Sequence, residues 1–246
     1  MKIVLFSLFG INVYSHGVFL TLAMIIGGLL LFRLANKEQL ETKNFLYNYV
    51  VSLITGVFAS RILFYLININ SYQNIYQVAE IWEGGLVSFA GFVAGAFAFY
   101  LLLKTQKQKI LPWFDLTGIV FPLALAIGRI GCVLNGEIGI KSNSIISYYG
   151  YAPVAAFEIY LGIAIFIINF SLYLYAKKHL IPYFLIFNFV AFYSFVRIFI
   201  DSYRADPSLL IGINLSQLTS LMVFIIAIIS FSLYFYKGKW RQNGSR

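Results

Sequence analysis

Residues 154–176 read VAAFEIYLGIAIFIINFSLYLYA, a run of 23 residues with a single charged side chain, Glu158. An α-helix rises about 1.5 Å per residue, so a run of this length crosses a hydrocarbon core about 30 Å thick. The stretch therefore predicts a transmembrane helix, and its one carboxylate needs an explanation.

The rest of the chain has the same character. Its 246 residues are 61% hydrophobic and 11% charged, and the mean hydropathy is +0.83. In soluble domains about a quarter of the residues are charged, so this composition excludes a soluble domain. Gly91 and Gly95 form a GxxxG motif, which is typical of close helix packing. We predict an all-α membrane protein, a single integral membrane domain over residues 1–246, with seven transmembrane helices at about 17–34, 47–68, 84–103, 114–134, 154–176, 180–200 and 215–236.

Basic residues are distributed unevenly over the predicted loops. The net charge is +9, and with the N-terminus outside only Lys2, Lys141 and Arg204 fall on the outer side. Cytoplasmic loops carry such an excess of positive charge, which predicts an N-out, C-in protein of a cytoplasmic (inner) membrane. The basic loops then meet anionic membrane lipids rather than nucleic acid. The twelve residues of the inner side are Arg33, Lys37, Lys43, Lys104, Lys107, Lys109, Lys177, Lys178, Lys237, Lys239, Arg241 and Arg246.

The sequence offers little outside the bilayer. The first ten residues, MKIVLFSLFG, are apolar, but no small-residue cleavage site follows. We therefore expect an interfacial segment on the outer surface and no cleaved signal peptide. The single cysteine, Cys132, excludes an intrachain disulfide and a cysteine-based zinc site. His16 and His179 are predicted on opposite faces of the membrane, so we expect no metal and no cofactor.

Ionisable side chains within the spans are the next feature, because each costs about 2.5–3.5 kcal/mol near the bilayer centre. Since successive spans run in opposite directions, the polar residues of the spans and their ends fall in the outer half of the bilayer, while the inner half is nearly bare of charge. We predict a polar cavity open to the outer leaflet, formed by His16, Arg61, Arg129, Asn135, Glu137, Glu158, Arg197, Asp201 and Gln217.

Three arginines at one cavity predict an anionic ligand. A guanidinium fork matches a phosphate, and at this depth the available phosphate is a phospholipid headgroup. Two simpler explanations stay open. Long side chains such as Arg61 or Arg204 reach the interface from a helix end. Arg197, Asp201 and Arg204 share one helix face at i, i+4 and i+7, where they could form only an internal ion-pair ladder.

Residues 128–137, GRIGCVLNGE, resemble the signature of the prolipoprotein diacylglyceryl transferase family, G-R-x-G-N-F-x-N-x-E. The resemblance extends over nearly the whole chain. It includes GVFASRILFY at 56–65, WEGGL at 82–86, PVAAFE at 153–158, RIFIDSYRADP at 197–207 and LSQL at 215–218.

The resemblance implies a phosphatidylglycerol–prolipoprotein diacylglyceryl transferase. Such an enzyme moves the diacylglyceryl group of phosphatidylglycerol onto the lipobox cysteine of a prolipoprotein signal peptide, forms a thioether and releases glycerol phosphate. Its partners are these two substrates and the membrane lipids. The resemblance assigns Arg129 to the lipid phosphate and Arg197 to charge on the leaving phosphate, and it puts Asp201 at the place of a family glutamate. The other residues expected to bind phosphatidylglycerol are Asn135, Glu137, Arg204 and Arg61.

Three departures from the family pattern concern the acceptor thiol. Phe89 occupies the place of the family's histidine, Cys132 that of the first asparagine of the signature, and His16 that of an opening tyrosine. We hypothesise that His16 has taken over proton abstraction or thiol positioning, because an imidazole titrates near neutral pH. An interfacial His16 without a chemical role is the simpler alternative.

Two further functions remain open from the sequence. One is a paralogue that passes an anionic phospholipid to a different acceptor. The other is a seven-helix transport or lipid-binding protein without catalysis. A transporter needs access to its site from both leaflets, which the apolar inner half disfavours.

Overall fold

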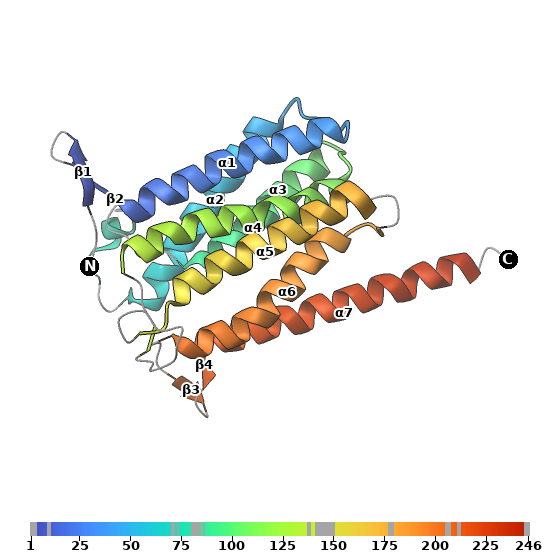
Figure 1. Cartoon of the computed structure of the whole chain (residues 1–246). Coiled ribbons are helices and arrows are strands. Elements are labelled where there is room, and N and C mark those ends of the chain that lie inside the picture. Colours follow the sequence, from blue (N-terminus) through green and yellow to red (C-terminus); the bar gives the residue numbers. More distant parts are fainter. Residues whose placement is uncertain are drawn as a thin grey trace. The chain divides into compact units, whose positions relative to one another are not determined.

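The computed structural model consists of long helices and two short hairpins (Figure 1). It describes residues 4–8, 11–69, 72, 74–79, 85, 87–136, 139–140, 151–176, 180–204, 208–210 and 213–243. Within these ranges seven helices are long and apolar enough to cross a membrane. They are α1 (Ser15–Lys37), α2 (Phe45–Ile67), α3 (Ser88–Thr105), α4 (Ile110–Leu134), α5 (Val154–Ala176), α6 (Phe184–Ile200) and α7 (Leu215–Asn243).

The predicted spans are confirmed, with differences at their ends that have local causes. α3 begins at Ser88 rather than near 84, because Gly85 adopts a φ of 80°, outside the helical region. α4 begins at Ile110, four residues earlier than predicted, because Pro112 lies in the first turn, where a missing N–H breaks no bond. α6 begins at Phe184 rather than near 180, since Tyr183 has a left-handed φ of 71° just after Pro182.

Short hairpins and single turns of 3₁₀-helix join some of the spans. The N-terminal segment predicted to lie at the interface forms an antiparallel hairpin of β1 (Val4–Leu8) and β2 (Ile11–Tyr14). A second hairpin, β3 (Ser208–Leu210) with β4 (Ile213–Asn214), leads into α7. The 3₁₀-helices η2 (Ile75–Ala79) and η5 (Asp201–Tyr203) follow α2 and α6 respectively. The location of the first hairpin at the membrane surface stays a prediction.

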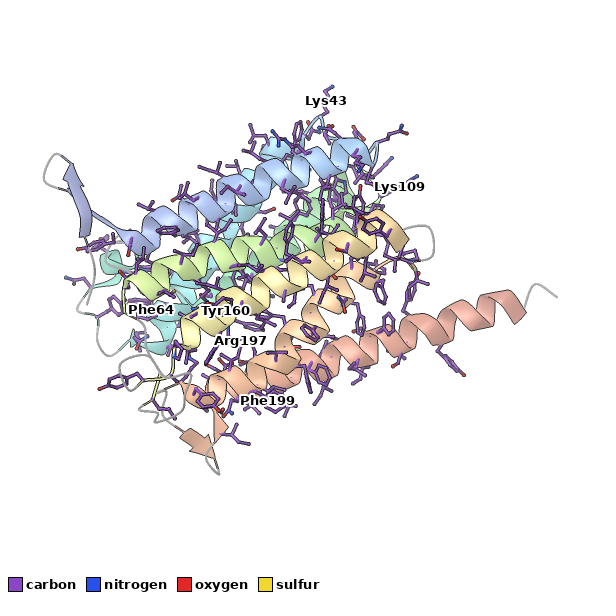
Figure 2. The ribbon with its side chains drawn as sticks, in the orientation of Figure 1. Lys43, Phe64, Lys109, Tyr160, Arg197 and Phe199 are labelled. Atoms are coloured by element: carbon purple, nitrogen blue, oxygen red, sulfur yellow. The ribbon has the colours of Figure 1, made fainter. Side chains whose placement is uncertain are left out.

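The chain divides into two compact units. The first comprises residues 1–31 and 114–246, and the second residues 32–113. The second unit contains α2 and α3, and its Lys43 and Lys109 side chains lie at the end where α2 begins, away from Phe64 (Figure 2). The first unit contains α5, α6, α7 and most of α1 and α4. Whether the two units act as a single domain stays a prediction.

Glycines set the packing of α2 against α3 in the second unit, as the GxxxG motif predicts. A Cβ added at Gly56 of α2 would lie 2.8 Å from the carbonyl oxygen of Gly91, and one at Gly95 would lie 3.1 Å from that of Ser52. Only glycine allows the two backbones this approach. Arg61 of α2 is 2% exposed in the same unit and donates to the carbonyl oxygens of Val78 and Gly85 at 3.0 and 3.2 Å.

In the first unit, a buried asparagine compensates for a proline on another helix. Pro122 lies inside α4 and has no N–H, so the carbonyl of Gly118 loses its intrahelical partner. Asn169 of α5, which is fully buried, donates to this carbonyl oxygen at 2.8 Å and to that of Leu185 at 3.0 Å. Asn188 of α6 in turn donates to Asn169 Oδ1 at 2.6 Å. The backbone of α4 is thereby satisfied where water is absent.

Asp115 of α4 caps the start of α6. Its carboxylate accepts backbone N–H groups of Tyr183 at 2.8 Å, Leu185 at 3.1 Å and Ile186 at 3.3 Å. The first amides of a helix have no intrahelical acceptor, and a negative charge there also complements the helix dipole. Asp115 is therefore a charged residue in the predicted inner half of the spans, which we expected to be nearly free of charge. Its three contacts are with backbone N–H groups, so they stabilise the start of α6.

The Pro122–Asn169 relation makes a testable prediction. Asn169→Leu leaves the Gly118 carbonyl without a donor and should lower the free energy of unfolding by about 1–3 kcal/mol. In a Pro122→Ala background, the N–H of residue 122 donates to that carbonyl. Asn169→Leu should therefore lower the free energy of unfolding by less than it does in the parent. Unfolding of all four variants in detergent micelles measures the difference. An equal loss in both backgrounds would show that Asn169 does not compensate for Pro122.

Candidate functional site

Glu158, in the first turn and a half of α5, is the centre of a buried charge cluster in the first unit. Its side chain is 1% exposed and forms ion pairs with Arg129 Nε of α4 and with Arg197 Nη1 of α6, the latter at 3.3 Å. In the described part of the chain neither of its oxygens has a partner in hydrogen-bond geometry. Two positively charged guanidinium groups therefore compensate for the burial of this carboxylate.

Arg197 also holds the end of its own helix. Its Nε and Nη2 donate to the two carboxylate oxygens of Asp201 at 3.1 and 2.8 Å, a bidentate pair one turn apart. Its Nη1 donates to the Tyr193 hydroxyl at 3.2 Å, from one turn before. Figure 2 shows Arg197 near the C-terminal end of α6, with Phe199 close by. The guanidinium is thus fixed on three sides by residues of two helices.

Asp201 connects the cluster to α7. It is fully buried and accepts a hydrogen bond from Ser220 Oγ of α7 at 3.2 Å. Asn214 and Gln217 cap each other at the start of α7, backbone N–H to side-chain oxygen, at 2.8 and 3.1 Å. Asn214 Nδ2 also donates to the Asp201 carbonyl at 2.6 Å. Gln217, which the sequence grouped with the polar residues, is part of this cap and fixes α7 to α6.

The start of α1 lies against the end of α4. A Cβ added at Gly131 would lie 2.8 Å from the Cα of His16, so this glycine permits the close approach. Ser15 Oγ donates to Asn135 Oδ1 at 2.8 Å, and the Cys132 sulfur lies 3.6 Å from His16 Nδ1. Arg129 Nη1 donates to the same sulfur at 3.6 Å. A continuous set of contacts therefore runs from His16 through Cys132 to Arg129 and the charge cluster.

Several of the predicted site residues are thus brought together. Arg129, Arg197 and Asp201 belong to the charge cluster, and His16 and Asn135 lie beside it through α4. The backbone N–H of Arg204 donates to the Asp201 carbonyl at 3.2 Å, which places Arg204 just beyond α6. Arg61 belongs to the second unit, where it holds backbone carbonyls of a loop. Glu137 lies outside the described residues.

The sequence analysis placed Glu158 in the predicted polar cavity but assigned it no role, and it did not identify Tyr193. The signal for Glu158 was available, since it is the one charged residue of its span and both arginines need a counter-ion. The signal for Tyr193 was its i, i+4 spacing to Arg197, which is weak in a chain with 18 tyrosines.

The exposures of the four charges indicate what the cluster can do. The side chains of Arg129 and Arg197 are 23% and 15% exposed, whereas those of Glu158 and Asp201 are 1% and 0% exposed. The carboxylates therefore lie behind the guanidinium groups, and the cluster presents positive charge although its formal charges cancel. Such an arrangement suits an anion that approaches from the exposed side. The polar cavity itself stays a prediction.

Comparison with known proteins gives one consistent result. A family model described as prolipoprotein diacylglyceryl transferase matches residues 3–233. Similar proteins are phosphatidylglycerol–prolipoprotein diacylglyceryl transferases, among them those of Clostridioides difficile strain 630 (28% identical; 99% of this chain, 98% of the relative) and Campylobacter jejuni subsp. doylei (29% identical; 93% and 92%). Together with seven apolar helices, this indicates a multi-pass bacterial membrane protein. The chain belongs to the prolipoprotein diacylglyceryl transferase family.

Proposed function

We propose that this chain transfers the diacylglyceryl group of phosphatidylglycerol to the lipobox cysteine of a prolipoprotein. The names of its relatives and the family match support this function. The observation that carries it is the pair of arginines, Arg129 and Arg197, each paired with one oxygen of the buried Glu158 carboxylate. Such a pair is suited to bind the one anionic group of the donor lipid, its phosphate.

In this reaction the cysteine sulfur attacks the terminal glycerol carbon of the diacylglyceryl group. A carbon–sulfur bond forms as the bond from that carbon to the phosphate oxygen breaks, and glycerol phosphate leaves with the bonding electrons. The thiol proton passes to a base. Negative charge therefore builds up on the phosphate, where fixed cationic donors lower the barrier most.

The two arginines have different parts in this proposal. Arg129 is the more exposed and receives the phosphate of the incoming lipid, while Arg197, fixed by Asp201 and Tyr193, stabilises the charge of the leaving phosphate. Glu158 holds both guanidinium groups near one another against their mutual repulsion. Because this network is formed before the lipid binds, little reorganisation is needed at the moment of reaction.

Further residues would complete the phosphatidylglycerol site. Asn135, at the end of α4, is held by Ser15 and is placed for a polar contact with the headgroup. Arg204 follows α6 and would donate to phosphate or glycerol oxygens. Glu137 follows α4 in the sequence and would accept hydrogen bonds from the glycerol hydroxyl groups. Arg61, whose described contacts hold a loop, would contribute mainly by shaping that loop.

His16 is our proposed base or positioning group for the acceptor thiol. A free thiol is only a few per cent ionised at neutral pH, so transfer gains from a group that takes its proton. In the tautomer in which His16 Nδ1–H donates to the Cys132 sulfur, Nε2 carries no hydrogen and is the nitrogen that accepts that proton. The residues in contact here, His16 and Cys132, both depart from the family pattern. We infer that they replaced the tyrosine and asparagine as a matched pair.

We further propose that the cluster faces the outer leaflet of the inner membrane, as the distribution of basic residues supports. An impermeant thiol reagent applied to intact cells tests this, using Lys43→Cys and Lys109→Cys against Tyr76→Cys, a residue that is 83% exposed. Only Tyr76→Cys should react. If Lys43→Cys and Lys109→Cys are labelled instead, the protein has the opposite orientation and the proposal is wrong.

The proposed activity is tested in cells depleted of their own transferase. Expression of this chain should restore a diacylglyceryl mass increment on a reporter prolipoprotein. Arg129→Lys keeps the charge beside Glu158 but loses the bidentate fork, so it should lower the transfer rate about a hundredfold. Arg33→Lys makes the same change on exposed α1 and should have no effect. If the reporter stays unmodified, the chain is either a paralogue with a different acceptor or a protein without catalysis. If Arg129→Lys is fully active, Arg129 does not bind the lipid phosphate through a bidentate contact.

The matched-pair inference is tested by a double-mutant cycle. His16→Tyr and Cys132→Asn should each slow transfer to a lipobox peptide, because each leaves a mismatched neighbour. The double variant should recover part of the rate, with a coupling free energy of about 0.5–3 kcal/mol. Effects that simply add would show that the two residues are independent. A His16→Phe variant with the parent rate would end the proposal that His16 assists the thiol.

A further inference from the structure

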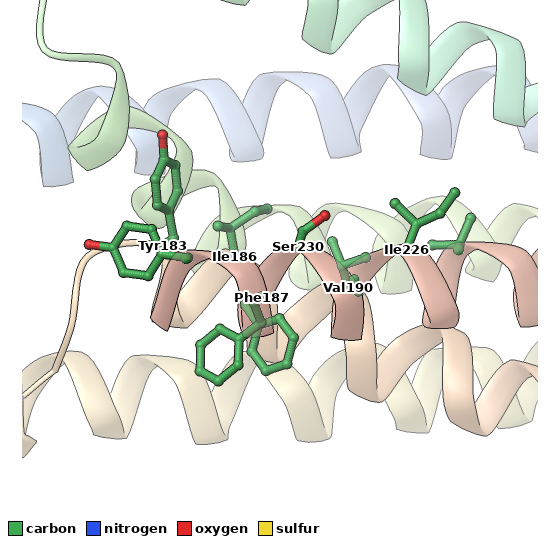
Figure 3. A pocket seen from close by; sticks show the side chains of 10 residues that line it. Tyr183, Ile186, Phe187, Val190, Ile226 and Ser230 are labelled. Atoms are coloured by element: carbon green, nitrogen blue, oxygen red, sulfur yellow. The ribbon is translucent and has the colours of Figure 1, made fainter. Parts of the chain in front are cut away.

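A groove between α6 and α7 lies apart from the charge cluster. Its volume is about 410 Å³, and its walls are formed by the first half of α6 and the middle of α7. Figure 3 shows Tyr183 at one end and Ile226 towards the other. Val190, the lining residue of α6 nearest to Arg197, lies seven positions before it, so roughly 10 Å of helix separates the groove from that arginine. The groove is therefore not part of the proposed active site.

Aromatic contacts between the two helices preform this groove. The rings of Phe187 and Phe231 stack with centroids 3.8 Å apart, and those of Tyr183 and Tyr234 meet edge to face at 5.7 Å. These two pairs hold α6 to α7, so the space beside them is bounded by fixed walls. Ala227, whose side chain is a single methyl, leaves part of that space open.

The walls have an apolar body and a polar end. Apart from one serine, Ser230, the lining residues between the two ends are aliphatic or phenylalanine side chains. Both tyrosines lie at the same end, where they also contact each other. Tyrosines are enriched at the level of the headgroups, and Tyr183 precedes the first residue of α6, so we infer that the groove runs from the interface into the hydrocarbon region. This is the path and the polarity profile of a phospholipid acyl chain.

The length of the groove is close to that of one acyl chain. The α7 wall runs from Val223 to Tyr234, about 16 Å at 1.5 Å per residue. One leaflet of the hydrocarbon core is about 15 Å thick, which is the depth that a single acyl chain spans. The length and volume of the groove therefore match a single acyl chain.

We propose that the α6–α7 groove binds one acyl chain of a membrane glycerophospholipid, from the leaflet next to Tyr183 and Tyr234. In the orientation proposed above this is the cytoplasmic leaflet. The bound chain fills the space that α6 and α7 leave between them, and so supports α7, whose spanning residues are otherwise not buried within the protein. The site is distinct from the donor site in place, polarity and leaflet.

Photolabelling of the full-length protein tests this site. The probe is a phosphatidylcholine with a diazirine in the middle of one acyl chain, in liposomes, and adducts are mapped by mass spectrometry. The parent should carry adducts concentrated on 183–190 and 223–234. Ser230→Trp fills the groove and should lower that labelling at least fivefold. The matched change Ser232→Trp, at an exposed position of the same helix outside the lining set, should leave it unchanged.

A second blocking variant guards against loss of fold in the first. Val190→Phe narrows the groove from the α6 wall and should have the same effect as Ser230→Trp. Adducts spread evenly over all lipid-facing helices, or equal labelling in the blocked and control variants, would overturn the proposal. Cross-links between two copies at these residues would also overturn it, since they would identify a helix as the occupant.

Discussion

The buried carboxylate of Glu158 is the constraint on which the first unit depends. An unpaired carboxylate in a medium without water is so unfavourable that it must be matched by positive charge. Glu158 meets this need with two guanidinium groups, one from α4 and one from α6, so its helix has to lie between those two. Arg197 extends the same requirement to Asp201, and Asp201 to α7. Four helices are therefore held together by one chain of charge compensation.

The same cluster explains how a stable membrane protein can keep a reactive surface. Its four formal charges cancel, so it is tolerated within the bilayer, yet its two carboxylates are buried deeper than its guanidinium groups. An anionic lipid thus meets fixed positive charge without a large change in the protein. The opposite half of this unit also contains polar groups, Asp115 and Asn169, but these are engaged with backbone atoms. Polar residues at one end of the unit thus satisfy backbone groups, whereas the arginines at the other end are available to bind a ligand.

The helices and the depth of the arginines could be predicted from the sequence, because a residue's position along its span gives its depth in the membrane. Run lengths gave the seven helices, and alternating direction placed Arg129 and Arg197 at one level, where the structure joins them through Glu158. The partners could not be predicted, since pairing depends on which helices are neighbours. Asn169 is the clearest case: its role depends on Pro122, 47 residues earlier on another helix. Helix starts were missed where one residue decided them, such as Gly85 and Pro182.

The central claim is that Glu158 holds two arginines in place for the phosphate of the donor lipid. The most direct measurement is the single-turnover rate of diacylglyceryl transfer from phosphatidylglycerol to a lipobox peptide by purified Glu158→Gln, compared with the parent. The glutamine keeps the shape of the side chain but removes the charge between the guanidinium groups, which then repel each other. We predict a rate lower by about a hundredfold in a protein that still inserts and folds, because two charge-stabilising donors are displaced together. A folded Glu158→Gln variant with the parent rate would contradict the account.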